Sequence, residues 1–525
     1  MSMTTLMQGG NSKQTPYLRK QGHTTQLIVD GQPFLVLGGE LHNSSSSHLE
    51  YMRPIWERLL ALNLNTVLAP VSWELIEPEE GIFDFSLVDG LIQEARRHNL
   101  RLIFLWFGSW KNGMSSYVPL WVKQDYSRFP RVKLQHGQAV EVLSTLIEAN
   151  WQADASAFAA LMRHIRVVDE NDHTVIMMQV ENEVGVLGDS RDRCEAAQHA
   201  FAAPVPSTLL EQLQQHRQEL SPELQHCWES NGLRASGNWQ EVFGSSVQSD
   251  EIFMAWHYAR YVDHVAAAGK AEYDIPMFVN AWLNRPQQQP GDWPSGGPLP
   301  HSFDLWLAGC PHIDLLSPDI YLDNFQEWCQ QYTRRGNLLF IPEMRRTEEC
   351  AQNFFYALGQ HEALGTSPFA IDSIENPAES ALSKSYSVLR QIAPLVLAHQ
   401  GQDTMIGFHL DEEHSSIIRE LGDYELEITL DQGFGMRGKY GYGLIISSGP
   451  HAFTGAGYGF QVSFRPKTSG PALVGIAAVD EGEFSQGKWI VMRRLNGDET
   501  NQGQRWRFSF LRPLSIEHCT VYRYE

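Results

Sequence analysis

The sequence VIMMQVENEVG at residues 175–185 decides the fold, because an apolar run leads directly into a cluster of carboxylates. Residues 175–180 are mainly β-branched or otherwise apolar, which is typical of a strand buried on both faces in a parallel sheet. Acidic side chains at the C-terminal end of such a strand lie where a (β/α)8 barrel keeps its reacting groups. A second apolar stretch, NLLFIPE at residues 337–343, also delivers a Glu. Two such strands in one barrel would bring Glu183 and Glu343 together.

Further segments complete a predicted α/β fold, a (β/α)8 TIM barrel in which short strands alternate with helices. In chain order, the eight predicted strands are residues 34–39, 65–69, 102–106, 175–180, 277–281, 313–317, 338–341 and 368–372. A long, polar, Gln-rich insert at residues 186–249 follows strand four, on the face where barrel loops grow. We expect a helix over residues 250–268 that stops at Gly269.

Helical periodicity disappears near residue 400, where short β segments bounded by turns replace it. The sequence therefore predicts a smaller all-β domain after the barrel, built as a sandwich or a barrel. We predict a disordered N-terminus at residues 1–16, a catalytic barrel at residues 17–398, and a β-sandwich-like domain at residues 399–525.

The composition excludes several classes of partner. A formal charge of -22 argues against binding to nucleic acid or to an anionic membrane surface. No run of 18 apolar residues occurs, so nothing is predicted to span a membrane.

The six cysteines are scattered without metal-ligand spacing, and His42 has no second His at such spacing, so we expect no metal site and no cofactor. The chain start has no signal-peptide pattern, which predicts a cytoplasmic protein, or a periplasmic or secreted one if an export signal was removed. Homo-oligomerisation stays open.

The carboxylates around strand four differ in depth. Side chains two apart on a strand share a face, so Glu181 and Glu183 point the same way. Glu183 lies nearer the open mouth and is the better candidate for acid/base work. Glu181 is deeper, which favours a structural or pKa-tuning role.

These residues carry a resemblance to a known family. The sequence QVENEVG at residues 179–185 resembles the acid/base motif of family 35 glycoside hydrolases, the β-galactosidases of clan A. The stretches WERLLALNLNTV at 56–67 and VSWELIEPEEGIFDF at 71–85 are similar to the same family's text around its second strand. The resemblance covers residues 20–395, and it is strongest to a bacterial branch that carries a C-terminal β domain of unassigned function.

One loop departs from the family pattern. Better-known members carry a Cys-Ala-Glu-Trp type sequence after strand three that helps to grip the galactose, whereas this chain reads FGSWKNGM at residues 107–114. Asn43 also stands where an aromatic is usual. Sugar-gripping residues of that loop therefore do not carry over directly.

The resemblance implies a retaining mechanism with two carboxyl groups. Glu343 would attack the anomeric carbon, while Glu183 would protonate the leaving oxygen and then activate water. Such a pair stands about 5–5.5 Å apart. Asn182 would hydrogen-bond the sugar 2-hydroxyl, and Tyr321 would donate to Glu343 and hold it ionised.

Other polar and aromatic residues at strand ends are candidates for sugar binding. Trp73, Trp110 and Trp282 follow strands two, three and five, where a ring either packs on a sugar or fills the core. Glu40 and Asn112 are candidates for gripping hydroxyl groups.

The predicted reaction is hydrolysis of terminal non-reducing β-D-galactosyl residues with retention. The substrate would be a β-galactoside oligosaccharide or a polysaccharide side chain. Two alternatives remain open: another retaining β-glycosidase, such as a β-glucosidase or β-arabinopyranosidase, and a catalytically silent carbohydrate-binding barrel. Transglycosylation shares the same intermediate and also stays open.

Overall fold

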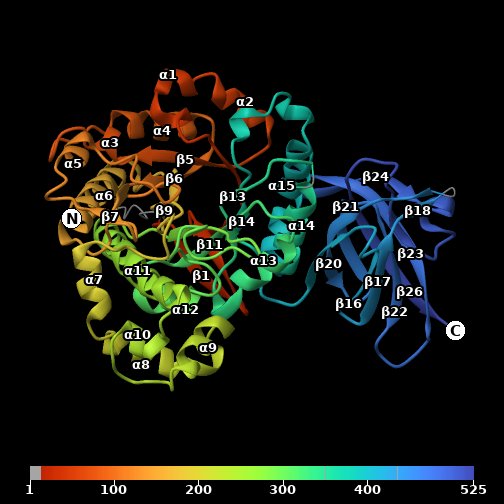
Figure 1. Cartoon of the computed structure of the whole chain (residues 1–525). Coiled ribbons are helices and arrows are strands. Elements are labelled where there is room, and N and C mark those ends of the chain that lie inside the picture. The colour runs from red at the N-terminus through yellow and green to blue at the C-terminus, as the bar shows by residue number, and fades with distance from the viewer. Residues whose placement is uncertain (1–13, 349, 434–435) are drawn as a thin grey trace, which may run out of the picture.

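The computed structural model describes residues 14–348, 350–433 and 436–525, so most of the predicted disordered N-terminus lies outside the described residues. A barrel and a C-terminal β unit stand side by side (Figure 1). In the described residues, no helix is both long and apolar enough to cross a lipid bilayer.

Nine parallel segments in the described chain form the barrel in the order β12-β14-β4-β5-β6-β9-β10-β11-β13. The segments β12 and β13 are two halves of strand seven, since only Pro342 separates them and it has no N–H to donate. They pair with opposite ends of the sheet and so close it into eight strands. The segments are β4 (Val36–Glu40), β5 (Thr66–Ser72), β6 (Arg101–Phe107), β9 (Val175–Val180), β10 (Met277–Trp282), β11 (Leu315–Ile320), β12 (Phe340–Ile341), β13 (Glu343–Met344) and β14 (Gly365–Thr366).

The predicted fold class is confirmed, with one strand misplaced. Strand eight was predicted at residues 368–372, but its pairing begins earlier, at Gly365–Thr366, continues as a parallel bridge between Phe369 and Glu40, and ends before the 3-10 turn Ile371–Ser373. The sheet pairs at the small residue Gly365, whose Cβ would lie 2.2 Å from the carbonyl oxygen of Val36. Only a small residue allows this approach, so the strand begins three residues before its predicted start.

Helices cover the outside of the barrel, and a small sheet packs at the N-terminal ends of its strands. The sheet is β1 (Tyr17–Gln21), β2 (Thr24–Val29) and β3 (Gln32–Pro33), and its Leu27 and Val29 join the apolar filling of the barrel. The covering helices are α1 (Leu49–Met52), α2 (Ile55–Ala61), α3 (Trp73–Ile76), α4 (Ser86–Arg97), α5 (Leu120–Gln124), α6 (Glu148–Asp169), α11 (Val247–Glu272), α12 (Phe303–Gly309), α13 (Phe325–Tyr332), α14 (Cys350–Gln360) and α15 (Ala381–His399). A hairpin of β7 (Arg131–Lys133) and β8 (Ala139–Leu143) lies after α5.

The insert after strand four is helical. Its elements are α7 (Glu195–Ala202), α8 (Ser207–Gln215), α9 (Pro222–Ser230) and α10 (Trp239–Phe243). The helix that follows, α11, does not stop at Gly269 as predicted but continues to Glu272.

The C-terminal unit is all-β, with two antiparallel sheets around one apolar core. One sheet has the order β15-β20-β21-β26-β23-β24 and the other β16-β17-β22-β25, with a small pair β18-β19. The strands are β15 (Met405–Leu410), β16 (Ser416–Leu421), β17 (Tyr424–Leu430), β18 (Gln432–Gly433), β19 (Met436–Arg437), β20 (Gly441–Gly449), β21 (Ala452–Tyr458), β22 (Phe460–Pro466), β23 (Leu473–Ser485), β24 (Lys488–Leu495), β25 (Trp506–Phe508) and β26 (Ser515–Tyr524).

Candidate active site

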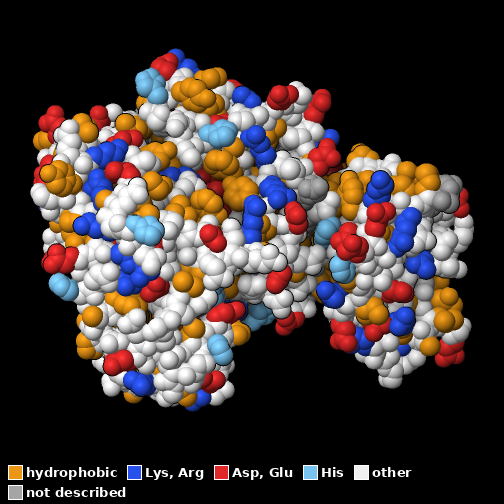
Figure 2. Space-filling model, in the orientation of Figure 1, with side chains coloured by type: hydrophobic (Ala, Val, Ile, Leu, Met, Phe, Trp, Pro, Cys, Tyr) orange, Lys and Arg blue, Asp and Glu red, His pale blue; other side chains and the backbone are white. Residues whose placement is uncertain are grey.

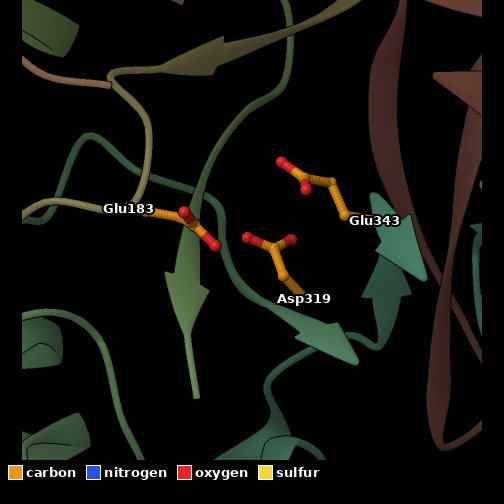
Figure 3. Close-up of side chains that lie close together, drawn as sticks. All are labelled: Glu183, Asp319 and Glu343. Atoms are coloured by element: carbon orange, nitrogen blue, oxygen red, sulfur yellow. The ribbon is translucent and has the colours of Figure 1, made fainter. Parts of the chain in front are cut away.

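Three carboxyl groups meet at the C-terminal ends of the barrel strands. Glu183 follows β9, Asp319 lies near the end of β11, and Glu343 begins β13. Their side chains point toward one another (Figure 3), and one oxygen of each lies within 4.8 Å of the others. Asp319 and Glu343 are register partners on neighbouring parallel strands, so the sheet itself sets their separation.

A cavity of about 400 Å³ opens above these carboxyl groups. Glu183, Asp319 and Glu343 line it together with Lys111 and Trp282. The volume falls in the range of small-ligand pockets, which is about 300–1,000 Å³. The position agrees with the rule that barrel sites lie at the C-terminal face.

Glu343 accepts two hydrogen bonds and lies close to a cation. The Tyr321 hydroxyl donates to Oε2 at 2.8 Å, and the Asn182 amide donates to Oε1 at 3.3 Å. The buried ammonium of Lys111 lies 3.8 Å from Oε1. These contacts fix the direction in which the Glu343 carboxyl group points.

Glu183 is buried close to Glu343. Burial, followed by the negative charge of Glu343, raises its pKa to about 7, against the lowering effect of Lys111. Asn112 donates to its Oε2 at 2.6 Å, and its own backbone N–H donates to the side chain of Asn280 at 2.9 Å. Its φ of 46° is in the left-handed region that non-glycine residues rarely adopt, and such strain is common at functional sites. The group can therefore hold a proton near neutral pH and also release it.

Two further buried carboxyl groups, Asp319 and Glu40, lie beside this pair. Burial and the charge of Glu343 raise the pKa of each well above its usual value. Asp319 accepts a hydrogen bond from Asn280 at 2.6 Å, whereas neither carboxyl oxygen of Glu40 has a hydrogen-bond partner among the described residues. Unsatisfied buried polar atoms are costly, so these oxygens suit contact with a ligand or with water.

Glu181 lies deeper and holds the loop after strand three. Its Oε2 accepts the Trp110 backbone N–H at 2.7 Å, and Asp154 accepts the Ser109 backbone N–H at 3.1 Å. Burial and Asp154 raise the pKa of Glu181 well above its usual value. A Cβ on Gly108 would lie 2.6 Å from Glu181 and 2.8 Å from Asp154, so only glycine fits between them. This arrangement fixes the loop that carries Lys111 and Asn112.

The structure places the predicted aromatic residues differently from one another. Trp282 lines the pocket and is 40% exposed. Trp73 is fully buried, with its indole N–H donating to Glu77 at 2.8 Å, so it does not line the pocket. Trp110 is also fully buried and packs edge-on against Tyr258 and Tyr261. Both belong to the core under the site rather than to its wall.

Lys111, Asp319 and Asn280 were not predicted as site residues. Two signals were present in the sequence. Asp319 is two residues before Tyr321, so the two side chains share a strand face, and Lys111 stands between two candidates in the loop that departs from the family pattern. Asn280 interrupts an apolar strand. Its role depends on tertiary contacts, because it accepts the backbone N–H of Glu183, which follows β9, and donates to Asp319 on β11.

The same three carboxyl groups offer oxygen atoms of the kind that bind metal ions. Glu183, Asp319 and Glu343 are the one group of such ligands in the described part of the chain that lies close enough together to share one. The positive charge next to them is the ammonium group of Lys111, which interacts electrostatically with all three carboxyl groups.

Comparisons with known proteins relate the barrel to one class of enzyme. Residues 48–242 match the glycoside hydrolase family 42 model, described as Beta-galactosidase. A β-galactosidase of Xanthomonas manihotis is 29% identical over 172 residues, which are 31% of this chain and 26% of that protein. Beta-galactosidase 17 of Arabidopsis thaliana is 29% identical over 174 residues, 31% of this chain and 22% of that protein. The barrel is similar to β-galactosidases of glycoside hydrolase clan A.

The likeness is partial in length. This chain spans about a quarter of each of these curated relatives. Among solved structures, the cold-adapted β-galactosidase of Rahnella sp. R3 aligns over 69% of this chain and 57% of that one, at 14% identity and a TM-score of 0.48. Residues 382–507 match a domain of unknown function, DUF5597.

Proposed function

We propose that the protein is a retaining glycoside hydrolase that releases terminal non-reducing β-D-galactosyl residues from β-galactosides. The observation that carries the proposal is the placement of Glu183 and Glu343, with one carboxyl oxygen of each within 4.8 Å of the other, the pKa of Glu183 raised, and the ammonium of Lys111 beside Glu343. A retaining pair needs this short separation, about 5–5.5 Å, because no water has to fit between the nucleophile and the sugar.

The first step forms a covalent glycosyl-enzyme. A carboxylate oxygen of Glu343 attacks the anomeric carbon, the bond to the leaving oxygen breaks, and Glu183 gives that oxygen its proton. Hydrogen bonds from Tyr321 and Asn182, together with the nearby ammonium of Lys111, hold the Glu343 carboxyl group in place at the cavity.

The second step reverses the roles. Once Glu343 is esterified, its negative charge is gone while the charge of Lys111 remains, so the pKa of Glu183 falls. Glu183 then takes a proton from water, which attacks the anomeric carbon and frees Glu343. Glu40, Asn112 and Trp282 are the proposed sugar contacts, since Asn112 and Trp282 line the cavity and Glu40 offers unpartnered oxygens beside it.

Two experiments test this proposal. Proton NMR during hydrolysis of p-nitrophenyl β-D-galactoside should show β-galactose as the first product, and α-galactose first would contradict the retaining mechanism. A 2-deoxy-2-fluoro-β-galactosyl fluoride should label the peptide that contains Glu343. Glu343→Gln should lower turnover at least about a thousandfold and abolish the label.

The sugar and the finer family assignment are tested separately. The family model that matches is that of family 42, whereas the sequence motifs predicted family 35. Membership of family 35 therefore remains a prediction. A panel of aryl β-glycosides should show the highest kcat/KM for the galactoside. A higher value for the glucoside or arabinopyranoside would replace the proposed sugar, and inactivity on every glycoside would favour a binding protein.

A further inference from the structure

A second, larger cavity adjoins the pocket that holds the carboxyl groups. Its volume is about 1130 Å³, compared with about 400 Å³ for the inner pocket. Arg285 and Leu322 line both cavities, so the two share a wall. If a terminal sugar fills the inner pocket, the rest of the substrate must leave it through an adjoining space. We call the larger cavity the outer groove.

The insert after strand four helps to build the outer groove. Glu223 from α9 lines it, as do Asn284 and Arg285 after β10, and Trp328 and Gln331 on α13. The elements therefore come from several loops of the C-terminal face, where barrels vary their substrate specificity. Both α9 and α13 can be followed in Figure 1.

Most charges in the groove wall already have partners within the protein. Arg345 pairs with Asp323 at 2.7 Å, and His301 pairs with Glu251 at 2.8 Å. Arg334 donates to the backbone carbonyl groups of residues 300 and 219. The wall is thus polar but close to neutral, which does not favour a charged ligand.

The groove wall includes an amide and a guanidinium group that keep their hydrogen-bonding capacity. Neither the Asn284 amide nor the Arg285 guanidinium makes a side-chain hydrogen bond or an ion pair within the described residues. Planar amide and guanidinium groups present fixed sets of donors, and the amide adds an acceptor. Pairs of neighbouring hydroxyl groups on a sugar match such sets.

We propose that the outer groove binds the leaving group of the substrate, and that this leaving group is an uncharged oligosaccharide of two or more sugar residues. The volume of the outer groove exceeds the range of drug-sized ligand pockets, which is about 300–1,000 Å³. A single sugar ring would therefore leave most of the groove empty. This inference rests on the proposed galactosidase function and adds the substrate class to it.

Binding energy in the groove should appear in kcat/KM, because contacts with remote parts of a substrate help to bring it to the transition state. The test uses the full chain and a series of β-galactosyl-capped oligosaccharides with one to four sugars after the scissile bond. We expect kcat/KM to rise at least tenfold between one and three sugars. A value that does not change with length, alongside normal hydrolysis of p-nitrophenyl β-D-galactoside, would overturn the groove and leave the proposed function intact. No hydrolysis of any galactoside would overturn both.

Substitutions in the groove sharpen the test. Arg285→Ala and Asn284→Ala should each lower the ratio of kcat/KM for the three-sugar substrate to that for the aryl galactoside, by roughly fivefold to tenfold. The matched control is Arg234→Ala, an exposed arginine on the same insert that lines neither cavity. It should leave the ratio unchanged. Unchanged ratios in both groove variants, with thermal unfolding curves like that of the unmodified protein, would contradict the proposal.

Discussion

Lys111 gives the candidate site a buried positive charge within reach of every carboxyl group that faces the cavity. It is almost fully buried, and Glu343 is its nearest ion-pair partner. Its ammonium also lies over the ring of Phe107, 5.1 Å from the centroid, so apolar and charged contacts both hold the side chain in place.

Replacing this charge should change the pH profile in a definite direction. Lys111 lowers the pKa of Glu183, so Lys111→Met should raise it and move the alkaline limb of kcat/KM to higher pH. The rate at the optimum should fall at least about tenfold, because Glu343 loses its counter-ion. Steady-state kinetics from pH 5 to 10 measure both effects. Lys123→Met, at a lysine outside the cavity, should change neither, and an unshifted limb in Lys111→Met would refute the charge argument.

The acid/base residue itself predicts the pH dependence of the unmodified enzyme. Glu183 must be protonated to act as the acid, and its pKa is about 7. The value of kcat/KM should therefore fall about tenfold per pH unit above pH 7, since this ratio reports the free enzyme. A profile that stays flat to pH 9 would show that another group donates the proton.

At the scale of elements, a close contact between α11 and α6 explains why one predicted helix end was wrong. Gly269 lies inside α11, and a Cβ there would meet the ring of Phe158 on α6 at 2.3 Å. Gly269 therefore allows α11 and α6 to approach each other closely, and it does not end α11.

This contact predicts the effect of adding one methyl group. Gly269→Ala should improve helix propensity by about 0.5–1 kcal/mol but cost about 1–3 kcal/mol through overpacking, so the protein should be destabilised. Thermal unfolding should shift down by a few degrees. Ala267→Gly, at a half-buried position of the same helix, measures the propensity term alone. A rise in Tm for Gly269→Ala would mean that α6 can yield.

At the scale of the whole molecule, the β unit packs on the barrel through α14. The α14 helix contacts β15 and β20, and Gln391 of α15 accepts the backbone N–H of Phe484 at 2.9 Å. Acidic and basic side chains are interspersed over both parts of the visible face (Figure 2). The packed glycines Gly359 and Gly407 bring helix and strand together, since a Cβ on Gly407 would lie 2.6 Å from the Phe355 carbonyl oxygen.

The joint between the two parts should be sensitive to one substitution. Gly407→Ala places its new methyl group against backbone atoms, which cannot rotate away, and should lower Tm by several degrees. Gly449→Ala meets nothing closer than 3.7 Å and serves as the control. Differential scanning calorimetry compares them, and equal values of Tm would show that the joint contributes little to stability.

The sequence by itself determined the alternation of strands and helices, and it named both carboxyl groups of the proposed pair. These features depend on local sequence, because an apolar run that leads to a Glu can be recognised in residues 175–183 and 338–343 without knowledge of the fold. The strands that were long and apolar were placed well, whereas the start of strand eight was placed three residues too late, because its pairing begins at the small residue Gly365.

Only the tertiary structure decided which polar residues share the cavity. Lys111 comes from the loop after β6 and Asp319 from β11, and their meeting with Glu343 depends on barrel closure and register. It also assigned Trp73 and Trp110 to the core and Trp282 to the wall, although all three follow strands in the same way. Which side chain faces a ligand is a property of packing in three dimensions, and local sequence pattern does not contain it.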